Sequence, residues 1–240
     1  MPSRISQAIV LVGEVTSGRP DLLPHPLTDI ADRPLIDHVL DRIGACGLTD
    51  VLVVLGGEEP EAAAWAAPLS DHLRDRTAPR AQVTSRGPND PLADAFHHPD
   101  GGPVLVVSAH ALWLDGPVGA IDRLMATWDA AAMDALVLGV AVTKSFGAAG
   151  LGDLAMDPLG RVTALTGGNL APHHNTGVHI VDPACLGSAS SLMQVLRGAM
   201  ARGRLFGLVH DGVWFHVGTQ ADLAMTREKL AEPEVRWVIS

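Results

Sequence analysis

Cysteine is nearly absent from this chain of 240 residues, which has only Cys46 and Cys185. The two form no Cys-x-x-Cys pair, and they do not suggest the disulfide framework of a secreted protein. We therefore expect a protein of the reducing cytoplasm.

The sequence also lacks a long hydrophobic run. The first apolar run, residues 8–12, follows a lone Arg4 and is too short for the core of a signal peptide or for a membrane span. Glycine, aspartate or histidine interrupts the longest of the other apolar runs. These absences predict a soluble protein that neither spans nor binds a membrane.

Positive charge is scarce. Lysine and arginine number 17 against 27 aspartates and glutamates, so the formal net charge is −10. An acidic surface repels a phosphate backbone, which argues against general nucleic-acid binding but leaves room for a small anionic ligand in a local pocket. The sequence has no P-loop, no His-Glu-x-x-His and no Gly-x-Ser-x-Gly motif, so the sites that these motifs mark are not expected.

Hydrophobic residues make up 47% of the chain, and their runs alternate with helical patterns. Residues 8–12, 50–55, 104–107 and 135–142 are continuously apolar, as strands are in a sheet covered on both faces, and 81–84 is a weaker strand candidate. Helices are predicted at 34–46, 59–76, 120–128, 190–201 and 222–230. A β-hairpin is predicted at 154–165, followed by an extended run at 177–181. This order predicts one α/β domain over residues 1–240, with a Rossmann-like, doubly wound, mixed and mostly parallel sheet and a hairpin insertion.

Several stretches of the sequence resemble one enzyme family. They are residues 24–38 (PHPLTDIADRPLIDH), 112–116 (LWLDG) and 203–219 (GRLFGLVHDGVWFHVGT), with Gly152-Asp153 and Thr176-Gly177 at matching spacing between them. Together they resemble the sugar-1-phosphate nucleotidyltransferases, most closely the N-acetylmuramate-1-phosphate uridylyltransferases and the mannose-1-phosphate guanylyltransferase-like proteins. The resemblance implies a nucleotide-diphospho-sugar transferase fold of the GT-A type. It also implies transfer of a nucleotidyl group from a nucleoside triphosphate to a sugar 1-phosphate with Mg²⁺, in a setting such as cell wall recycling.

The resemblance places the nucleotide phosphates at a glycine-rich loop after the first strand. Here that loop is shorter and Glu14 adds a negative charge, so Gly13, Gly18 and Arg19 are the expected remnants. A family lysine that contacts phosphate is replaced by His25, whose charge depends on pH. The family's glycine turn for the nucleobase falls at residues 87–91, where two prolines stand instead.

The resemblance also implies two metal positions and a sugar side. Both metal positions read as histidine, at His110 and His216, and imidazole suits Zn²⁺ or a similar ion better than Mg²⁺. We hypothesise that these two, with His210 or Asp211, bind a transition metal. The expected sugar side is Gly152, Asp153, Thr176 and Gly177.

The residues that the family uses to bind phosphates, nucleobase and metal are replaced at the glycine-rich loop, at His25, in the turn 87–91 and at the metal positions. These losses predict a degenerate nucleotidyltransferase, a pseudoenzyme with weak or lost catalysis that keeps the fold to bind a ligand or a protein partner. The first alternative is an active enzyme with an unusual metal site. The second is a structural subunit that self-associates through exposed apolar residues such as Trp65, Trp237 and the tail 235–239. The ligands expected on the first two readings are a nucleotide or a sugar phosphate, with Mg²⁺ only if the chain is active as its family is, and otherwise no cofactor.

Overall fold

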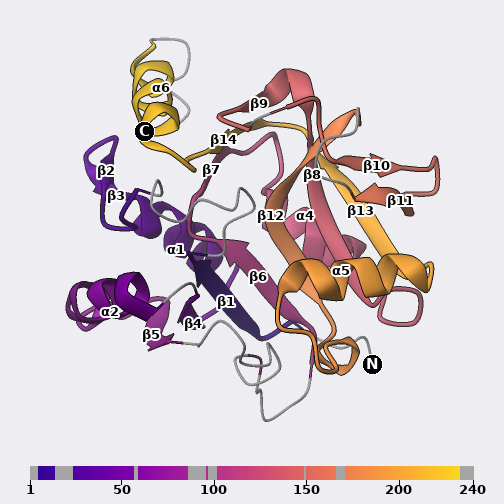
Figure 1. Cartoon of the computed structure of the whole chain (residues 1–240), viewed down its shortest axis with the longest axis horizontal. Coiled ribbons are helices and arrows are strands. Elements are labelled where there is room, and N and C mark those ends of the chain that lie inside the picture. The colour runs from indigo at the N-terminus through magenta and orange to yellow at the C-terminus, as the bar shows by residue number, and fades with distance from the viewer. Residues whose placement is uncertain are drawn as a thin grey trace.

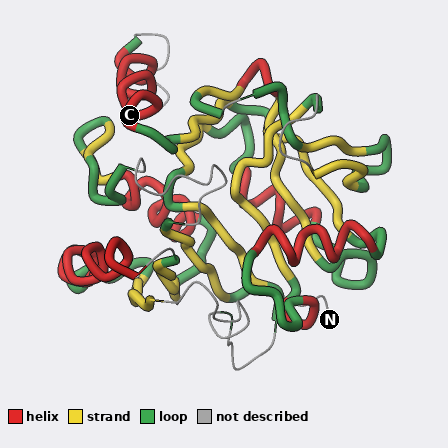
Figure 2. Tube along the Cα trace, viewed as in Figure 1, coloured by secondary structure: helices red, strands yellow, loops and turns green. Residues whose placement is uncertain are grey.

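The computed structural model describes residues 5–13, 24–56, 59–85, 96, 102–148, 150–165 and 171–232 (Figures 1 and 2). A nine-stranded sheet forms its centre. The strands of this sheet are β1 (Gln7–Val12), β4 (Asp50–Leu55), β5 (Arg80–Ser85), β6 (Val104–Ser108), β8 (Ala135–Ala141), β10 (Leu154–Met156), β11 (Val162–Leu165), β12 (His173–Val181) and β13 (Leu205–His210).

The sheet is mixed. Strands run in the order β11-β10-β12-β6-β1-β4-β5, and β8 pairs with both β12 and β13. The half β6-β1-β4-β5 and the pair β8-β13 are parallel, whereas β12 runs antiparallel to β6 and β8. The register of β12 against β8 shifts between Asn175 and His179. Because β12 runs antiparallel to β6, its start lies beside the carboxyl end of β6, at the edge of the sheet where β1 also ends and where ligands bind in open α/β sheets.

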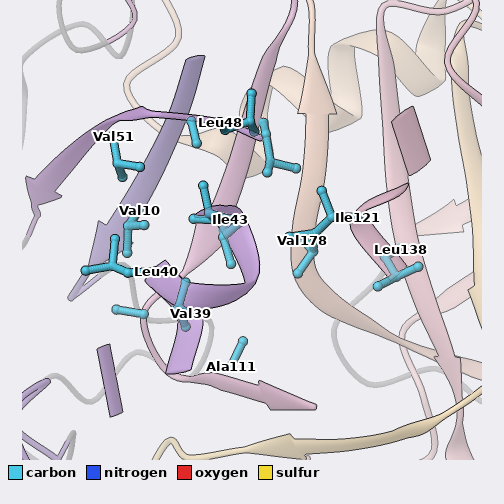
Figure 3. Packing of buried hydrophobic residues seen from close by; sticks show 14 of the residues in the cluster. Val10, Val39, Leu40, Ile43, Leu48, Val51, Ala111, Ile121, Leu138 and Val178 are labelled. Atoms are coloured by element: carbon cyan, nitrogen blue, oxygen red, sulfur yellow. The ribbon is translucent and has the colours of Figure 1, made fainter. Parts of the chain in front are cut away.

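Helices cover both faces of the sheet. The helices are α1 (Leu35–Ala45), α2 (Glu59–Leu73), α4 (Ala120–Thr127), α5 (Leu192–Ala201) and α6 (Gln220–Ala231). Side chains of α1, α2 and α4 join one core cluster and side chains of α5 join the other. Figure 3 shows Val39, Leu40 and Ile43 of α1 gathered beside Val10 of β1.

A smaller sheet stands at the end of the large one. Strand β14 (Val213–His216) pairs antiparallel with β7 (Ala111–Leu114) and parallel with β9 (Ser145–Phe146). A two-stranded ribbon, β2 (Asp29–Ile30) with β3 (Arg33–Pro34), lies near α6, and Arg227 of α6 donates to the carbonyl oxygen of Asp29 (Figure 1). A third apolar cluster joins this sheet, ribbon and helix.

The predicted fold class is confirmed. Every strand predicted from an apolar run is a strand of the large sheet, the weak candidate at 81–84 included, and the hairpin of β10 and β11 lies at 154–165 as predicted. The five predicted helices are present, although α2 ends at Leu73 instead of residue 76. The three-stranded sheet was not predicted. Among the described residues, no helix is long and apolar enough to cross a membrane.

Candidate functional site

The site lies where β1, β4 and β6 end. Gly13 follows β1 with φ +82°, and a Cβ on it would overlap the carbonyl oxygen of Gly56, the residue after β4. The N–H of Gly56 donates to the carbonyl oxygen of Val12 over 2.8 Å, which ties the two strand ends together. Glycine is therefore required at position 13 to let these backbones meet.

His110 leaves the end of β6 and is buried, with 2% of its surface exposed. Its Nε2 donates to the carbonyl oxygen of Pro24 over 3.1 Å, because a carbonyl can only accept. Its backbone carbonyl accepts from the N–H of Val217, which ties it to the segment after β14. The pKa of His110 is lowered to about 4, chiefly by burial; the bond to Pro24 opposes this shift, and His216 and His25 add to it. The ring is thus neutral at pH 7, and one of its two nitrogens is engaged with the backbone.

His25 belongs to the loop that His110 holds. Its Nδ1 accepts the N–H of Leu27 over 3.0 Å, and its ring stands edge-on against Trp65 with 5.3 Å between ring centroids. Burial lowers the pKa of His25 as well. At neutral pH this side chain therefore brings no full positive charge to the position of the family lysine.

His216, at the end of β14, pairs in register with Ala111. Burial lowers the pKa of His216, Asp222 and Asp153 oppose the shift, and His174 adds to it. His216 therefore interacts electrostatically with two carboxylates and a second imidazole. Its ring lies over Gly218, where any larger residue would overlap it.

The residues of the expected sugar side lie in two segments, the turn before β10 and the start of β12, which are hydrogen-bonded to each other. Gly152 has φ +87°, and a Cβ on it would overlap the carbonyl oxygen of Ala171. The next residue, Asp153, accepts the N–H of Asn175 on Oδ1 over 2.7 Å. Burial raises the pKa of Asp153. Gly152 thus allows the close approach that aims the Asp153 carboxylate at the start of β12.

The other half of the sugar side lies beside the end of β6. A Cβ on Gly177 would lie 2.9 Å from Cβ of Ser108. The hydroxyl of Thr176 donates to the carbonyl oxygen of Leu138 over 2.8 Å and accepts from the N–H of Val178. Thr176 is 3% exposed. Its hydroxyl therefore braces the strand and is not free for a ligand.

No protein-family model matches the chain. The N-acetylmuramate alpha-1-phosphate uridylyltransferase of Caulobacter vibrioides is 30% identical over 228 residues, which cover 87% of this chain and 89% of the relative. The enzyme of the same name from Neisseria meningitidis serogroup B is 27% identical over 207 residues, covering 83% and 86%. The chain belongs to the sugar-1-phosphate nucleotidyltransferase family.

A solved structure supports the fold of this family. A protein described as a glucose-1-phosphate thymidylyltransferase from Bacillus anthracis, crystallised with sucrose, superposes with a TM-score of 0.65. The alignment covers 94% of this chain and 96% of that one at 14% identity. The resemblance read from the sequence motifs is thereby confirmed as a family and as a fold.

Mg²⁺, the ion that the family generally uses, does not fit the residues present. The two positions that the family resemblance assigns to the metal hold the imidazoles of His110 and His216, and Mg²⁺ prefers oxygen ligands. Nε2 of His110 is engaged with Pro24. Of the nearby carboxylates, Asp222 accepts from the Thr219 hydroxyl that caps α6. Within the described ranges, no group of three or more histidines, cysteines, aspartates or glutamates is placed to hold a metal ion.

The structure separates His210 and Asp211 from His216, with which the hypothesis of a transition-metal site groups them. Nε2 of His210 donates to the carbonyl oxygen of Leu114, and the carboxylate of Asp211 pairs with Arg123 over 2.8 Å. Leu114 pairs with Val213, at the opposite end of β14 from His216. His210 and Asp211 therefore do not join a metal site at His110 and His216.

Some predicted positions cannot be placed. Gly18 and Arg19, the loop 87–91 and the tail with Trp237 lie outside the described residues. Two residues that the motifs did not mark do lie at the site: Asn175, bonded to Asp153, and His179, bonded to Asn175. Their signal in the sequence is that His173 to Thr176 are all polar at the start of this strand, and that His179 interrupts its apolar second half.

Buried histidines predict a strong dependence of stability on pH. Burial lowers the pKa of His110 to about 4 and that of His179 to about 3, whereas an unfolded chain protonates histidine near pH 6.5. Below pH 6.5 these histidines bind protons in the unfolded state but not in the folded state, so the free energy of unfolding falls as the pH falls. We expect a loss of about 2 kcal/mol per histidine between pH 7 and pH 5.

Urea unfolding at pH 7, 6 and 5 measures this effect. His110→Gln and His179→Gln each remove one titrating ring and keep an N–H donor, so each variant should lose about 2 kcal/mol less than the parent over that range. Equal pH slopes in parent and variants would show that these rings do not titrate as their burial implies.

Proposed function

We propose that this chain keeps the sugar-phosphate side of a sugar-1-phosphate nucleotidyltransferase and transfers the nucleotidyl group weakly or not at all. It is then a ligand-binding pseudoenzyme of its family. The observation that carries the proposal is His110: a buried, neutral imidazole bonded to the Pro24 carbonyl where the family resemblance expects a metal-binding aspartate.

The charges around the site support this proposal. Transfer between two phosphates needs cations to offset the charge of the transition state. The pKa values of His110, His216 and Asp153 respond to other histidines and to carboxylates, since Asp222 and Asp153 both act on His216. No lysine or arginine of the described ranges is among the groups that shift these three pKa values. Among the described residues, these three side chains therefore offer nucleotide phosphates little positive charge, and a single phosphate on a sugar needs less charge compensation.

The ligand that we propose is a sugar 1-phosphate. Asp153 supplies a carboxylate for sugar hydroxyls, and Gly152 and Gly177 fix the backbone around it. Because the Caulobacter and Neisseria relatives are both named for N-acetylmuramate 1-phosphate, this compound is the first to test.

Calorimetric titration of the full chain tests the binding. N-acetylmuramate 1-phosphate should bind with an affinity that is equal with and without Mg²⁺, and Asp153→Asn should weaken it by about tenfold through loss of a charged acceptor. Asp71→Asn, which alters an exposed pair on α2 with Arg74, is the matched control and should change nothing. Binding of UTP that requires Mg²⁺ would contradict the proposal, and so would the absence of sugar-phosphate binding.

One observation favours a second function, that of an active enzyme with a transition metal. His110 and His216 both have lowered pKa values, and the neutral imidazole is the form that binds Zn²⁺ and similar ions. Metal analysis of the purified protein decides between the two. Bound metal that His110→Ala removes would favour the active enzyme, and a metal-free protein would exclude that metal site.

A further inference from the structure

The loop of residues 24–28 runs from the end of β6 to the start of α1, and its second half is bonded to the helix. The N–H of Leu35 donates to the carbonyl oxygen of Thr28 over 2.9 Å. The N–H of Ile36 donates to that of Pro26 over 3.0 Å. These two bonds belong to the first turn of α1, so they hold the second half of the loop without help from the first half.

Side chains hold the first half of the loop. Nε2 of His110 donates to the carbonyl oxygen of Pro24 over 3.1 Å. The ring of His25 stands edge-on against Trp65 of α2. Among the described residues, no backbone–backbone hydrogen bond joins Pro24 or His25 to another element. The position of this half of the loop therefore depends on His110 and Trp65.

The backbone of His110 is fixed from two sides. The N–H of Ala109 donates to the carbonyl oxygen of Leu11 in β1, and the N–H of Val217 donates to that of His110, each over 2.9 Å. The side chain of His110 is buried, and the bond to Pro24 is the one hydrogen bond of its ring within the described ranges. A buried polar ring is stable only through the bonds that it makes, so the loop explains the histidine.

The bond to the loop needs a donor at position 110. The carbonyl oxygen of Pro24 can only accept, and the N–H of the imidazole supplies the proton. The aspartate that the family resemblance expects at this position would turn negatively charged acceptor oxygens toward the same carbonyl. A carboxylate would therefore repel the loop in the place where the imidazole of His110 holds it.

We propose that residues 24–28 form a strap that His110 closes over the end of β6, where ligands bind in open α/β sheets. A ligand that reaches this strand end must first open the strap. Opening moves the first half of the strap, while the second half stays bonded to α1. The proposal concerns the free protein, so it holds or fails independently of the sugar phosphate proposed above.

His25 makes the opening measurable. Its carbonyl oxygen accepts the N–H of Thr28 over 2.8 Å, and its Nδ1 accepts the N–H of Leu27 over 3.0 Å. When the first half of the strap moves away, these two strap amides lose their acceptors. The two helix amides, those of Leu35 and Ile36, keep theirs. Exchange of the strap and helix amides with deuterium thus distinguishes an opened strap from a loosened protein.

Amide exchange of the isotope-labelled full chain, followed by NMR, tests the strap. His110→Leu removes the donor and keeps a side chain of similar size, so the strap amides should exchange about tenfold faster than in the parent, the effect of one lost hydrogen bond. His110→Asp should accelerate them at least as much. His110→Gln keeps an N–H donor and should leave their exchange within about twofold of the parent. The helix amides should exchange as in the parent in all three variants.

His210→Leu is the matched control. His210 is also buried and also donates Nε2 to a backbone carbonyl oxygen, but that oxygen belongs to Leu114 of β7. The variant should leave the exchange of the strap amides unchanged. If His210→Leu accelerated them as much as His110→Leu does, the strap would not depend on the bond to Pro24 and the proposal would be wrong.

A second variant keeps the test decisive if His110→Leu does not fold. Trp65→Ala removes the ring that stands against His25, and it should accelerate the same strap amides. Unchanged exchange of the strap amides in a folded His110→Leu or Trp65→Ala protein would overturn the proposal. Equal acceleration of the helix amides would overturn it as well, because the loop and the start of α1 would then have loosened together.

Discussion

Asp115→Ala is expected to lower the free energy of unfolding by about 3 kcal/mol, because this carboxylate has three partners that would lose their acceptor. It pairs with the guanidinium of Arg42, accepts the indole N–H of Trp113 over 3.0 Å and accepts the backbone N–H of Ala120 over 2.8 Å. The side chains of Arg42 and Asp115 are 30% and 24% exposed, so water offsets the loss only in part.

The same network explains the size of this effect. Arg42 also donates to the carbonyl oxygen of Trp113 over 2.6 Å and lies 5.1 Å above its indole ring. That ring stacks on Trp214 of β14 at 5.4 Å between centroids. Asp115 thus holds α1, α4 and the small sheet in one arrangement, and the small sheet carries His216 to the site.

Urea unfolding of the parent and three variants measures the contribution of Asp115. Asp115→Asn keeps an oxygen for two of the N–H donors and should lose less than Asp115→Ala. Asp71→Ala removes an ion pair whose side chains are 66% and 69% exposed, and it should change stability by less than about 0.5 kcal/mol. If Asp115→Ala cost no more than Asp71→Ala, the network would not hold these elements together.

The large sheet could be predicted because each of its main strands is a short apolar run that can be recognised in the sequence by itself. Residues 8–12 and 135–142 are continuous apolar runs, and each became a central strand with neighbours on both sides. Helix α1 was equally clear, since Leu35, Ile36, Val39, Leu40 and Ile43 repeat at helical spacing and are all buried. Local periodicity carries this information without knowledge of the partner elements.

The small sheet could not be predicted in the same way. Strand β14 has four residues, β9 has two, and Trp214 pairs with Trp113 and with Ser145, both distant in sequence. Strands this short have no period to read, and their pairing depends on where the large sheet and α6 leave apolar surface.

The place of His110 in the fold could be predicted, but its contacts could not. His110 follows a strand, and the carboxyl ends of parallel strands meet at one edge, so its place was foreseen. Its bond to the carbonyl of Pro24 depends on how the loop 24–28 packs across that edge, which no motif records. Asn175 and His179 were missed because residues four apart in a regular strand do not meet, and only the register shift brings them together.

Transfer activity is expected to be lower than that of the uridylyltransferase relatives by a factor of at least about 10⁴. Loss of one group that stabilises the charge of the transition state lowers the rate roughly 10²- to 10³-fold. By the family resemblance, His110 and His25 stand where two such groups, an aspartate and a lysine, are expected. Neither ring carries a full positive charge at neutral pH, since burial lowers both pKa values.

The most direct measurement is the initial rate of nucleotide-sugar formation from UTP or GTP and a panel of sugar 1-phosphates, with Mg²⁺ and with Mn²⁺. The Caulobacter vibrioides N-acetylmuramate alpha-1-phosphate uridylyltransferase, assayed in parallel, is the positive control. The proposed loss of catalysis predicts no product above the protein-free background with any pair of substrates. Turnover within about a hundredfold of the control enzyme with Mg²⁺ would contradict it, because the imidazole of His110 would then stand in a working metal site.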